Sequence, residues 1–280
     1  RGSKQAEKEG RRSRVFANSM SDLFQHDVPL DFIDKAFAAM ALASEHDFLV
    51  LTKRSRVMRD YVRRETTPAR IAGHLEDYTD SPCVENLKHM LEDRDPEAWP
   101  LPNVWLGVSV ESQEWADKRI PDLLNTPAAV HWISAEPLLG PLDLKLAPIG
   151  AWPTMRPTMS HWMPNKDEWD DWKFWMHKDN GIQWVVGGME SGAGARPGHP
   201  DWARGLRDQC QQAGVPFFWK QWGEHLPFGQ DGAQCGTLVV AHGHEFYRCR
   251  KSRSGRTLDG RTWDEFPKAR GVLRAAGDPA

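Results

Sequence analysis

The stretch "NVWLGVSV", residues 103–110, is an almost continuous apolar run. A strand with one wet face alternates apolar and polar residues, whereas this run has apolar side chains on both faces. Such strands are typical of a parallel sheet that helices cover on both sides. Polar Ser109 lies near the end of the run, and Glu111 follows it.

Five similar runs flank this one, and amphipathic stretches separate them. The runs cover residues 15–17, 48–52, 130–135, 182–188 and 215–219, and the amphipathic stretches cover 30–44, 84–92, 113–124 and 200–213. Asp31 and Pro200 suit helix starts, and Gly214 suits a helix end. We expect all six strands to be buried, including the one at 15–17. They predict an α/β fold with a partial, open (β/α) barrel of parallel strands, since eight strands close a full barrel. A doubly wound sheet is the alternative, because pattern alone does not fix strand order.

Composition narrows the class of protein. The chain has 280 residues, 40% of them hydrophobic, and a net charge of −3, so no global basic field indicates nucleic-acid binding. We expect residues 1–13 to be a disordered or trimmed basic start, with a phosphate-binding arm as the alternative. Residues 14–225 form the expected barrel, including a Trp-rich insertion at 151–181, and residues 226–280 form a C-terminal extension. No apolar run suits a membrane helix, and four cysteines without a CxxC pair suggest a cytoplasmic setting.

Polar or charged residues follow every predicted strand. They are Ser21 and Asp22, Lys53 and Arg54, Ser109 and Glu111, Glu136, Glu190, and Lys220 and Gln221. The carboxyl ends of parallel barrel strands converge on one face, where active sites of this fold are built. We therefore expect a shared pocket with Lys53, Glu136, Glu190 and Lys220 as catalytic candidates, although wet loops alone would also make strand ends polar.

Three of these endings have competing interpretations. The glycine-rich stretch at 184–197 surrounds Glu190, and Gly188 would let a ligand approach the backbone closely; a flexible turn is the alternative. Glu136 is a general base, a ligand clamp or a salt-bridged strand end. Lys220 pairs with a substrate carboxylate or phosphate, or forms an internal ion pair with Glu190 or Glu136.

Two further clusters lie outside the strand ends. Six tryptophans fall between positions 152 and 184 and would stack on a base or sugar, close a lid, bind a partner or, as we favour, pack on their own domain. A second cluster has two cysteines and two histidines, for which we favour an ordinary hairpin over a zinc site: Cys235, His242, His244 and Cys249.

Six ordered blocks carry a resemblance to a known family. They are "VFANSMSDLFQHDVP", "FLVLTKR", "NVWLGVSVES", "WISAEPLLGPLDL", "VVGGMESGAGARPGHPDWARGLRDQCQQAGVPFFWKQWGE" and "LDGRTWDEFP". The chain resembles the phage-associated gp thirty-seven/gp sixty-eight family, which is similar to radical S-adenosylmethionine enzymes. The blocks run from about residue 14 to residue 267.

The resemblance implies a partial barrel that binds S-adenosylmethionine across its strand ends. Block order implies that Ser19, Ser21 and Asp22 hold the methionine amino group and that Ser109 and Glu111 meet the ribose or carboxylate. It also implies a [4Fe–4S] cluster, whose three-cysteine motif lies upstream of the first block in the family and is not in this sequence. We therefore expect either a missing first unit or a cluster-free member, which binds S-adenosylmethionine weakly or not at all.

Three functions remain open. The first is a radical-S-adenosylmethionine-like enzyme or enzyme remnant of a phage or prophage, acting in the bacterial cytoplasm on a nucleotide or nucleic-acid-related substrate. The second is a barrel hydrolase with Glu136 and Glu190 as acid and base. The third is a non-catalytic barrel that binds a partner through its Trp-rich insertion and basic start.

Overall fold

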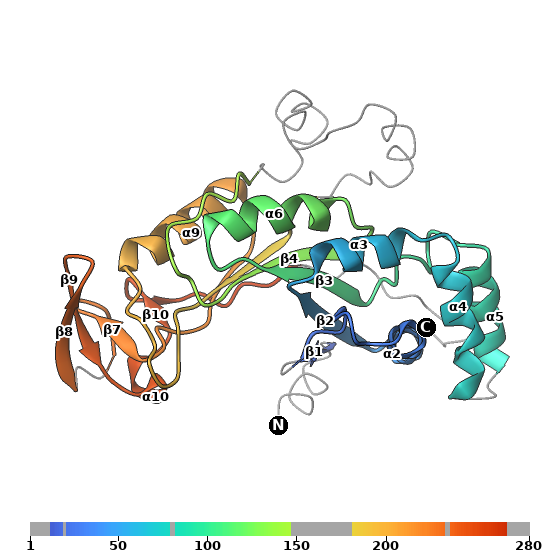
Figure 1. The fold of residues 1–280 in the computed structure, drawn as a ribbon, viewed down its shortest axis with the longest axis horizontal. Helices are drawn as coiled ribbons and strands as arrows, with labels where there is room; N and C mark the ends of the chain where they lie inside the picture. Colours follow the sequence, from blue (N-terminus) through green and yellow to red (C-terminus); the bar gives the residue numbers. More distant parts are fainter. Residues whose placement is uncertain (1–11, 19–20, 79–81, 147–180, 233–235, 268–280) are drawn as a thin grey trace. The chain divides into compact units, whose positions relative to one another are not determined.

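The computed structural model describes residues 12–18, 21–78, 82–146, 181–232 and 236–267. The chain divides into two compact units, of which the first comprises residues 1–108, 125–131 and 268–280 and the second comprises residues 109–124 and 132–267. Figure 1 shows the elements of both. Ser19 lies outside the described residues, as does all of the Trp-rich insertion except its last residue, Gly181.

One six-stranded sheet has the order β1-β2-β3-β4-β5-β6. Its strands are β1 (Ser13–Ala17), β2 (His46–Thr52), β3 (Val104–Ser109), β4 (Val130–Ala135), β5 (Trp184–Gly187) and β6 (Phe217–Trp219). The pairings β1–β2, β2–β3, β4–β5 and β5–β6 are parallel. Sequential order without a reversal is that of a partial, open barrel, and the doubly wound alternative is wrong because it needs a point where the order reverses.

Strand burial follows the apolar pattern in the middle of the sheet. Every residue of β3, β4 and β5 is buried, as expected for strands covered on both faces. The expectation of a buried first strand is wrong, since Val15 is 38% exposed and Phe16 is 45% exposed. Among the strands that the structure describes, β1 lies at the edge of the sheet and pairs only with β2, so fewer of them cover its side chains.

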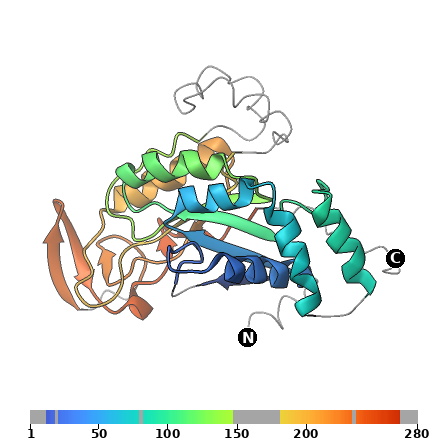
Figure 2. The same ribbon diagram turned by 45° about the vertical axis from the view of Figure 1, so that its right-hand side comes forward.

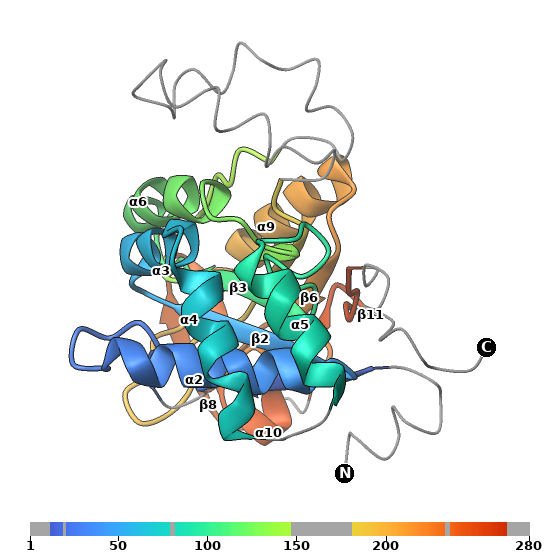
Figure 3. The same cartoon turned by 90° about the vertical axis from the view of Figure 1, so that its right-hand side faces the viewer.

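The helices of the first unit are α2 (Leu30–Leu42), α3 (Ser55–Arg63), α4 (Thr67–Gly73), the short 3₁₀ helix at Leu75–Asp77 and α5 (Pro82–Glu92). Figure 3 shows α4 and α5 lying side by side.

A buried carboxylate, Asp34 of α2, joins three of these helices. It accepts hydrogen bonds from the hydroxyl of Tyr61 at 2.9 Å and from Nε of Arg70 at 2.8 Å.

In the second unit, α6 (Gln113–Leu124) and α9 (Pro200–Ala213) lie side by side on the same side of β4 (Figures 1 and 2). The predicted bounds of both helices are confirmed. Gly214 ends α9 with a positive φ of 71°, as its position predicts, because glycine adopts this left-handed conformation without a steric cost.

The C-terminal part of this unit is antiparallel. β7 (His225–Pro227), β8 (Thr237–Ala241) and β9 (His244–Arg248) form a sheet in the order β7-β9-β8, followed by α10 (Lys251–Ser254) and the pair β10 (Thr257–Leu258) and β11 (Arg261–Thr262). The predicted hairpin at 235–249 is thus confirmed for β8 and β9.

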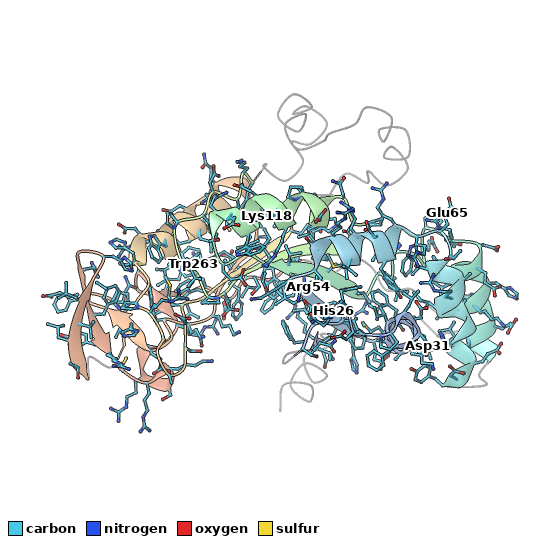
Figure 4. The ribbon with its side chains drawn as sticks, in the orientation of Figure 1. His26, Asp31, Arg54, Glu65, Lys118 and Trp263 are labelled. Carbon is cyan, nitrogen blue, oxygen red and sulfur yellow. The ribbon has the colours of Figure 1, made fainter. Side chains whose placement is uncertain are left out.

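Asp259 anchors this part to α9. Its carboxylate accepts hydrogen bonds from Arg204, Arg207 and Gln230. The bond from Arg204 is the main reason that the pKa of Asp259 lies well below its usual value. Nearby Trp263, labelled in Figure 4, lies under the guanidinium groups of Arg207 and Arg261. No helix in the described part of the chain is long and apolar enough to span a bilayer.

Candidate functional site at the ends of β4, β5 and β6

An ion pair joins the residues that follow β4 and β6. The Nζ atom of Lys220 lies 3.2 Å from Oε2 of Glu136. The Lys220 side chain is 52% exposed and that of Glu136 is 16% exposed, so the ammonium group reaches solvent while the carboxylate is mostly covered. Of the two internal partners that the sequence left open for Lys220, the structure selects Glu136.

Backbone hydrogen bonds hold these residues in register beyond the strand ends. Gly188 donates to the carbonyl of Ala135, and Leu138 donates to the carbonyl of Gly188. Lys220 donates to the carbonyl of Gly187 at 2.8 Å. The segments that carry Glu136, Gly188 and Lys220 are therefore extensions of the sheet, and a site built on such a rigid frame is held more precisely than one on a free loop.

Gly188 gives the Glu136 carboxylate its space. A Cβ atom built on Gly188 would lie 2.6 Å from Oε1 of Glu136, closer than real contacts allow. The close approach that the sequence predicted at Gly188 is thus made by a side chain of the protein itself. We name Glu136, Gly188 and Lys220 the strand-end site.

Glu190 has a different partner. Its Oε2 atom accepts hydrogen bonds from the backbone N–H and Nε of Arg196, both at 2.8 Å, and its Oε1 accepts from Nη2 of Arg196 at 3.0 Å. These bonds lower the pKa of Glu190, with the side-chain bonds from Arg196 as the largest cause. The carboxylate thus closes the glycine-rich loop on itself, which is more constrained than a flexible turn.

A second carboxylate and a histidine lie beside this loop. Oε1 of Glu224 accepts a hydrogen bond from the backbone N–H of Gly192 at 3.3 Å. His225 is buried, its Nδ1 atom has no hydrogen-bond partner within the described residues, and burial lowers its pKa. Strand endings gave no signal for Arg196 or His225, which lie in the stretches "ESGAGAR" and "WGEH" of the sequence.

A buried ion pair lies at the end of β3. Nη1 of Arg119 donates to Oε2 of Glu111 at 2.9 Å and to the carbonyl oxygen of Ser109 at 2.7 Å. Both charged side chains are less than 10% exposed, at 7% for Arg119 and 9% for Glu111. The guanidinium carbon lies 4.1 Å from the ring centroid of Trp115. These contacts give Ser109 and Glu111 a role in fixing α6 to the end of β3, and their binding of a cofactor stays a prediction.

In the first unit, Asp22 joins the loops that follow β1 and β2. Its Oδ1 atom accepts from Oγ1 of Thr52 at 2.7 Å and from the backbone N–H of Phe24 at 3.0 Å, and its Oδ2 accepts from the backbone N–H of Lys53 at 2.9 Å. Three protein donors leave this carboxylate little remaining capacity for a ligand. Its predicted role with a cofactor stays a prediction, as does that of exposed Ser21.

Two cations follow β2. Lys53 and Arg54 are exposed, and Nη2 of Arg54 donates to Oε1 of Gln25 at 2.8 Å. In Figure 4, Arg54 and His26 are labelled in these two neighbouring loops. The catalytic role predicted for Lys53 stays a prediction.

The comparisons with known proteins give one family. The chain belongs to the family described as "Protein of unknown function (DUF5131)", whose family model matches residues 3–267. No curated protein and no solved structure matches the chain.

Proposed function

We propose that this member of the DUF5131 family binds an S-adenosylmethionine-type ligand at the strand-end site, as the ligand-binding barrel of a radical-S-adenosylmethionine-like enzyme. The observation that carries the proposal is the ion pair of Glu136 and Lys220 beside Gly188, on the carboxyl ends of parallel strands. Ligands of open α/β sheets bind outside these strand ends.

The charges of the site suit the amino-acid part of such a ligand. A methionine moiety carries one ammonium and one carboxylate, and Lys220 and Glu136 offer the opposite charges side by side. The Lys220 ammonium is exposed enough to meet a carboxylate, while Glu136 accepts hydrogen bonds from an ammonium or from ribose hydroxyls. Hydrogen bonds to charged groups contribute about 1.5–3 kcal/mol each, so a few of them support a weak complex.

The iron–sulfur cluster that the resemblance implies does not fit the described residues. Cys210 is buried in α9, and burial raises the pKa of its thiol, which disfavours the thiolate that ligates iron. Cys249 is buried too, and the described part of the chain has no group of three histidine, cysteine or acidic side chains arranged for a metal. The proposal is therefore confined to the ligand, and no step of a reaction is routed through a cluster.

The contacts of Glu190 do not support the hydrolase alternative. A glycosidase-type mechanism needs one carboxylic acid with a raised pKa that stays protonated, and one ionised carboxylate with an oxygen free to act as base or nucleophile. Arg196 instead lowers the pKa of Glu190 and uses both of its carboxylate oxygens.

The family resemblance adds two elements to the proposal. The substrate is a nucleotide or is related to nucleic acid, and the protein comes from a phage or prophage. Both elements rest on the resemblance alone.

Ligand-observed saturation-transfer NMR tests the proposal, because it detects weak complexes. The ligands are S-adenosylmethionine, S-adenosylhomocysteine, methionine and adenosine, offered to the wild type and to Lys220→Met and Glu136→Gln. The matched control is Lys118→Met, since Lys118 also forms an exposed ion pair, with Glu114 of α6. We expect S-adenosylhomocysteine to bind the wild type, each strand-end variant to bind it at least about tenfold more weakly, and the control to be unchanged. Absence of binding to the wild type, or equal binding to Lys220→Met, contradicts the proposal.

A further inference from the structure

We propose that the sheet β7-β9-β8 binds single-stranded nucleic acid on one of its faces. The residues of that face are Phe228, Leu238, Val240 and Tyr247, which we name the aromatic face. Strand register puts them on one side: Leu226 and Leu238 both pair with Tyr247, and Phe228 and Val240 follow two residues after them. Leu226 shares this side but is fully buried, and Glu245, which pairs with Val240, lies on it as well. The rings of Phe228 and Tyr247 lie 6.0 Å apart, centroid to centroid.

The opposite face of the same sheet is packed against the protein. Phe246 is fully buried. At the tip of the hairpin, the His244 ring lies 5.6 Å from the ring of His199, and the His242 ring lies 5.0 Å from that of Trp202. These contacts dock the hairpin on the start of α9, so the sheet has one covered face.

The aromatic face is open by comparison. Phe228 is 52% exposed, Leu238 is 50% exposed and Val240 is 68% exposed. Large apolar side chains gathered on one exposed surface mark a binding site rather than an ordinary part of the surface. Aromatic rings on a sheet surface are the stacking platforms that single-stranded nucleic acids use, because the face of every base is apolar and polarizable.

Local charge identifies the partner as an anion. Residues 236–258 contain five basic residues and one acidic residue, although the whole chain has a net charge of −3. Arg250, Lys251 and Arg253, directly after β9, are exposed. The four residue-to-residue steps from Tyr247 to Lys251 span at most about 14 Å, so long basic side chains reach the phosphates of a strand whose bases stack on Tyr247.

This combination favours a single strand over other partners. A duplex buries the faces of its bases and offers only phosphates to the basic residues, which leaves the aromatic face unused. A protein partner would bury the apolar side chains but gives no reason for the concentration of cations beside them. The inference does not depend on the strand-end site, which takes a small ligand.

Fluorescence anisotropy with labelled oligonucleotides tests it on the full chain. The probes are a 12-nucleotide dT strand, the same length of rU and a 12-base-pair duplex, with heparin as a competitor. The variants are Phe228→Ala and the double change Arg250→Gln/Lys251→Gln. Their matched controls are Phe32→Ala, since Phe32 on α2 is 56% exposed, and Arg56→Gln, since the side chain of Arg56 on α3 is 80% exposed.

The proposal expects the single strands to bind more tightly than the duplex. Phe228→Ala should weaken single-strand binding by about 5- to 150-fold, the range for one stacked base, while Phe32→Ala leaves it unchanged. The double change should reduce the slope of log K against log salt by about 1.4, since each phosphate contact of a single strand contributes about 0.7, and Arg56→Gln should not. Any one of three results overturns the proposal. The first is no binding at low salt. The second is binding of duplex and heparin as tight as that of the single strands, with no effect of Phe228→Ala, and the third is a loss in the control variants equal to that in the test variants.

Discussion

Oε1 of Glu136 and the α-carbon of Gly188 are in such close contact that a Cβ on residue 188 would come within 2.6 Å of the carboxylate oxygen. The Glu136 side chain is 16% exposed, so protein atoms cover most of it. Its other oxygen pairs with Lys220. The strand-end site thus has this geometry because residue 188 is a glycine, with no Cβ atom where Oε1 of Glu136 lies.

The change Gly188→Ala should displace Glu136 from Lys220. We expect it to destabilise the fold by about 1–3 kcal/mol, as overpacking does, and to weaken ligand binding as much as Lys220→Met does. Urea unfolding and saturation-transfer NMR measure the two effects. The control is Gly205→Ala in α9, where an added Cβ meets nothing within 4 Å; it should stabilise by about 0.5–1 kcal/mol. A Gly188→Ala chain that binds ligand like the wild type would show that the position of Glu136 is unimportant.

The bond between Glu190 and Arg196 should make the glycine-rich loop sensitive to acid. Since Arg196 lowers the pKa of Glu190 in the folded chain, this carboxylate stabilises the fold at pH values above its unfolded pKa and loses that contribution as the pH falls through the folded pKa. We expect the carboxyl NMR signal of Glu190 to titrate below its usual pKa of about 4.3, and its midpoint to rise in Arg196→Met. An unchanged midpoint would mean that Arg196 does not hold the carboxylate in solution.

Replacing only one member of the buried ion pair at the end of β3 should lower the free energy of unfolding strongly. Arg119→Met removes the guanidinium group that pairs with the buried Glu111 carboxylate, and we expect a loss of about 3–5 kcal/mol in the free energy of unfolding. The double change Glu111→Leu/Arg119→Met should recover most of it. Lys118→Met, on the exposed side of α6, should change stability by less than about 0.5 kcal/mol. Equal losses in the single and double variants would show that Arg119 acts through packing on Trp115 and not through charge.

The sheet and several helices could be predicted because apolar periodicity reports burial directly. α6 and α9 have the predicted bounds, and β3 is buried along its whole length. α3 and α4 were missed. α3 has an arginine or aspartate at four of its nine positions, and α4 is only seven residues long, so neither has a long apolar period. Periodicity also could not show that β1 is an edge strand.

The candidate site was predicted as a set of residues but not as a set of partners. Strand endings indicated Glu136, Glu190 and Lys220, yet the pattern left open which carboxylate pairs with the lysine. Arg196 decides this, because it engages both oxygens of Glu190 and leaves Glu136 for Lys220. Such a choice depends on where a loop folds back, and glycines at Gly192 and Gly194 with positive φ direct that fold without any periodic signal.

The buried hydroxyl of Tyr61 gives a prediction at high pH. Burial, and after it the Asp34 carboxylate, raises the pKa of Tyr61, so the folded chain favours the neutral phenol. This contribution to stability is complete below the unfolded pKa of about 10 and falls as the pH rises above it, by up to about 1.4 kcal/mol per pH unit. At pH 7, Tyr61→Phe should cost about 1.5–3 kcal/mol, since Asp34 loses a hydrogen bond.

The wild type and Tyr61→Phe should therefore converge as the pH rises. The phenylalanine has no proton to lose when the chain unfolds, whereas the unfolded wild type is stabilised by ionisation of its tyrosine. With the slope above, the difference in the free energy of unfolding should vanish at about pH 11–12. Urea unfolding at a series of pH values from 7 to 12 measures it. Tyr78→Phe is the control, because Tyr78 is 51% exposed and should change stability by less than about 0.5 kcal/mol at pH 7. A constant difference between wild type and Tyr61→Phe across the series would mean that Tyr61 ionises as readily in the folded chain as in the unfolded one.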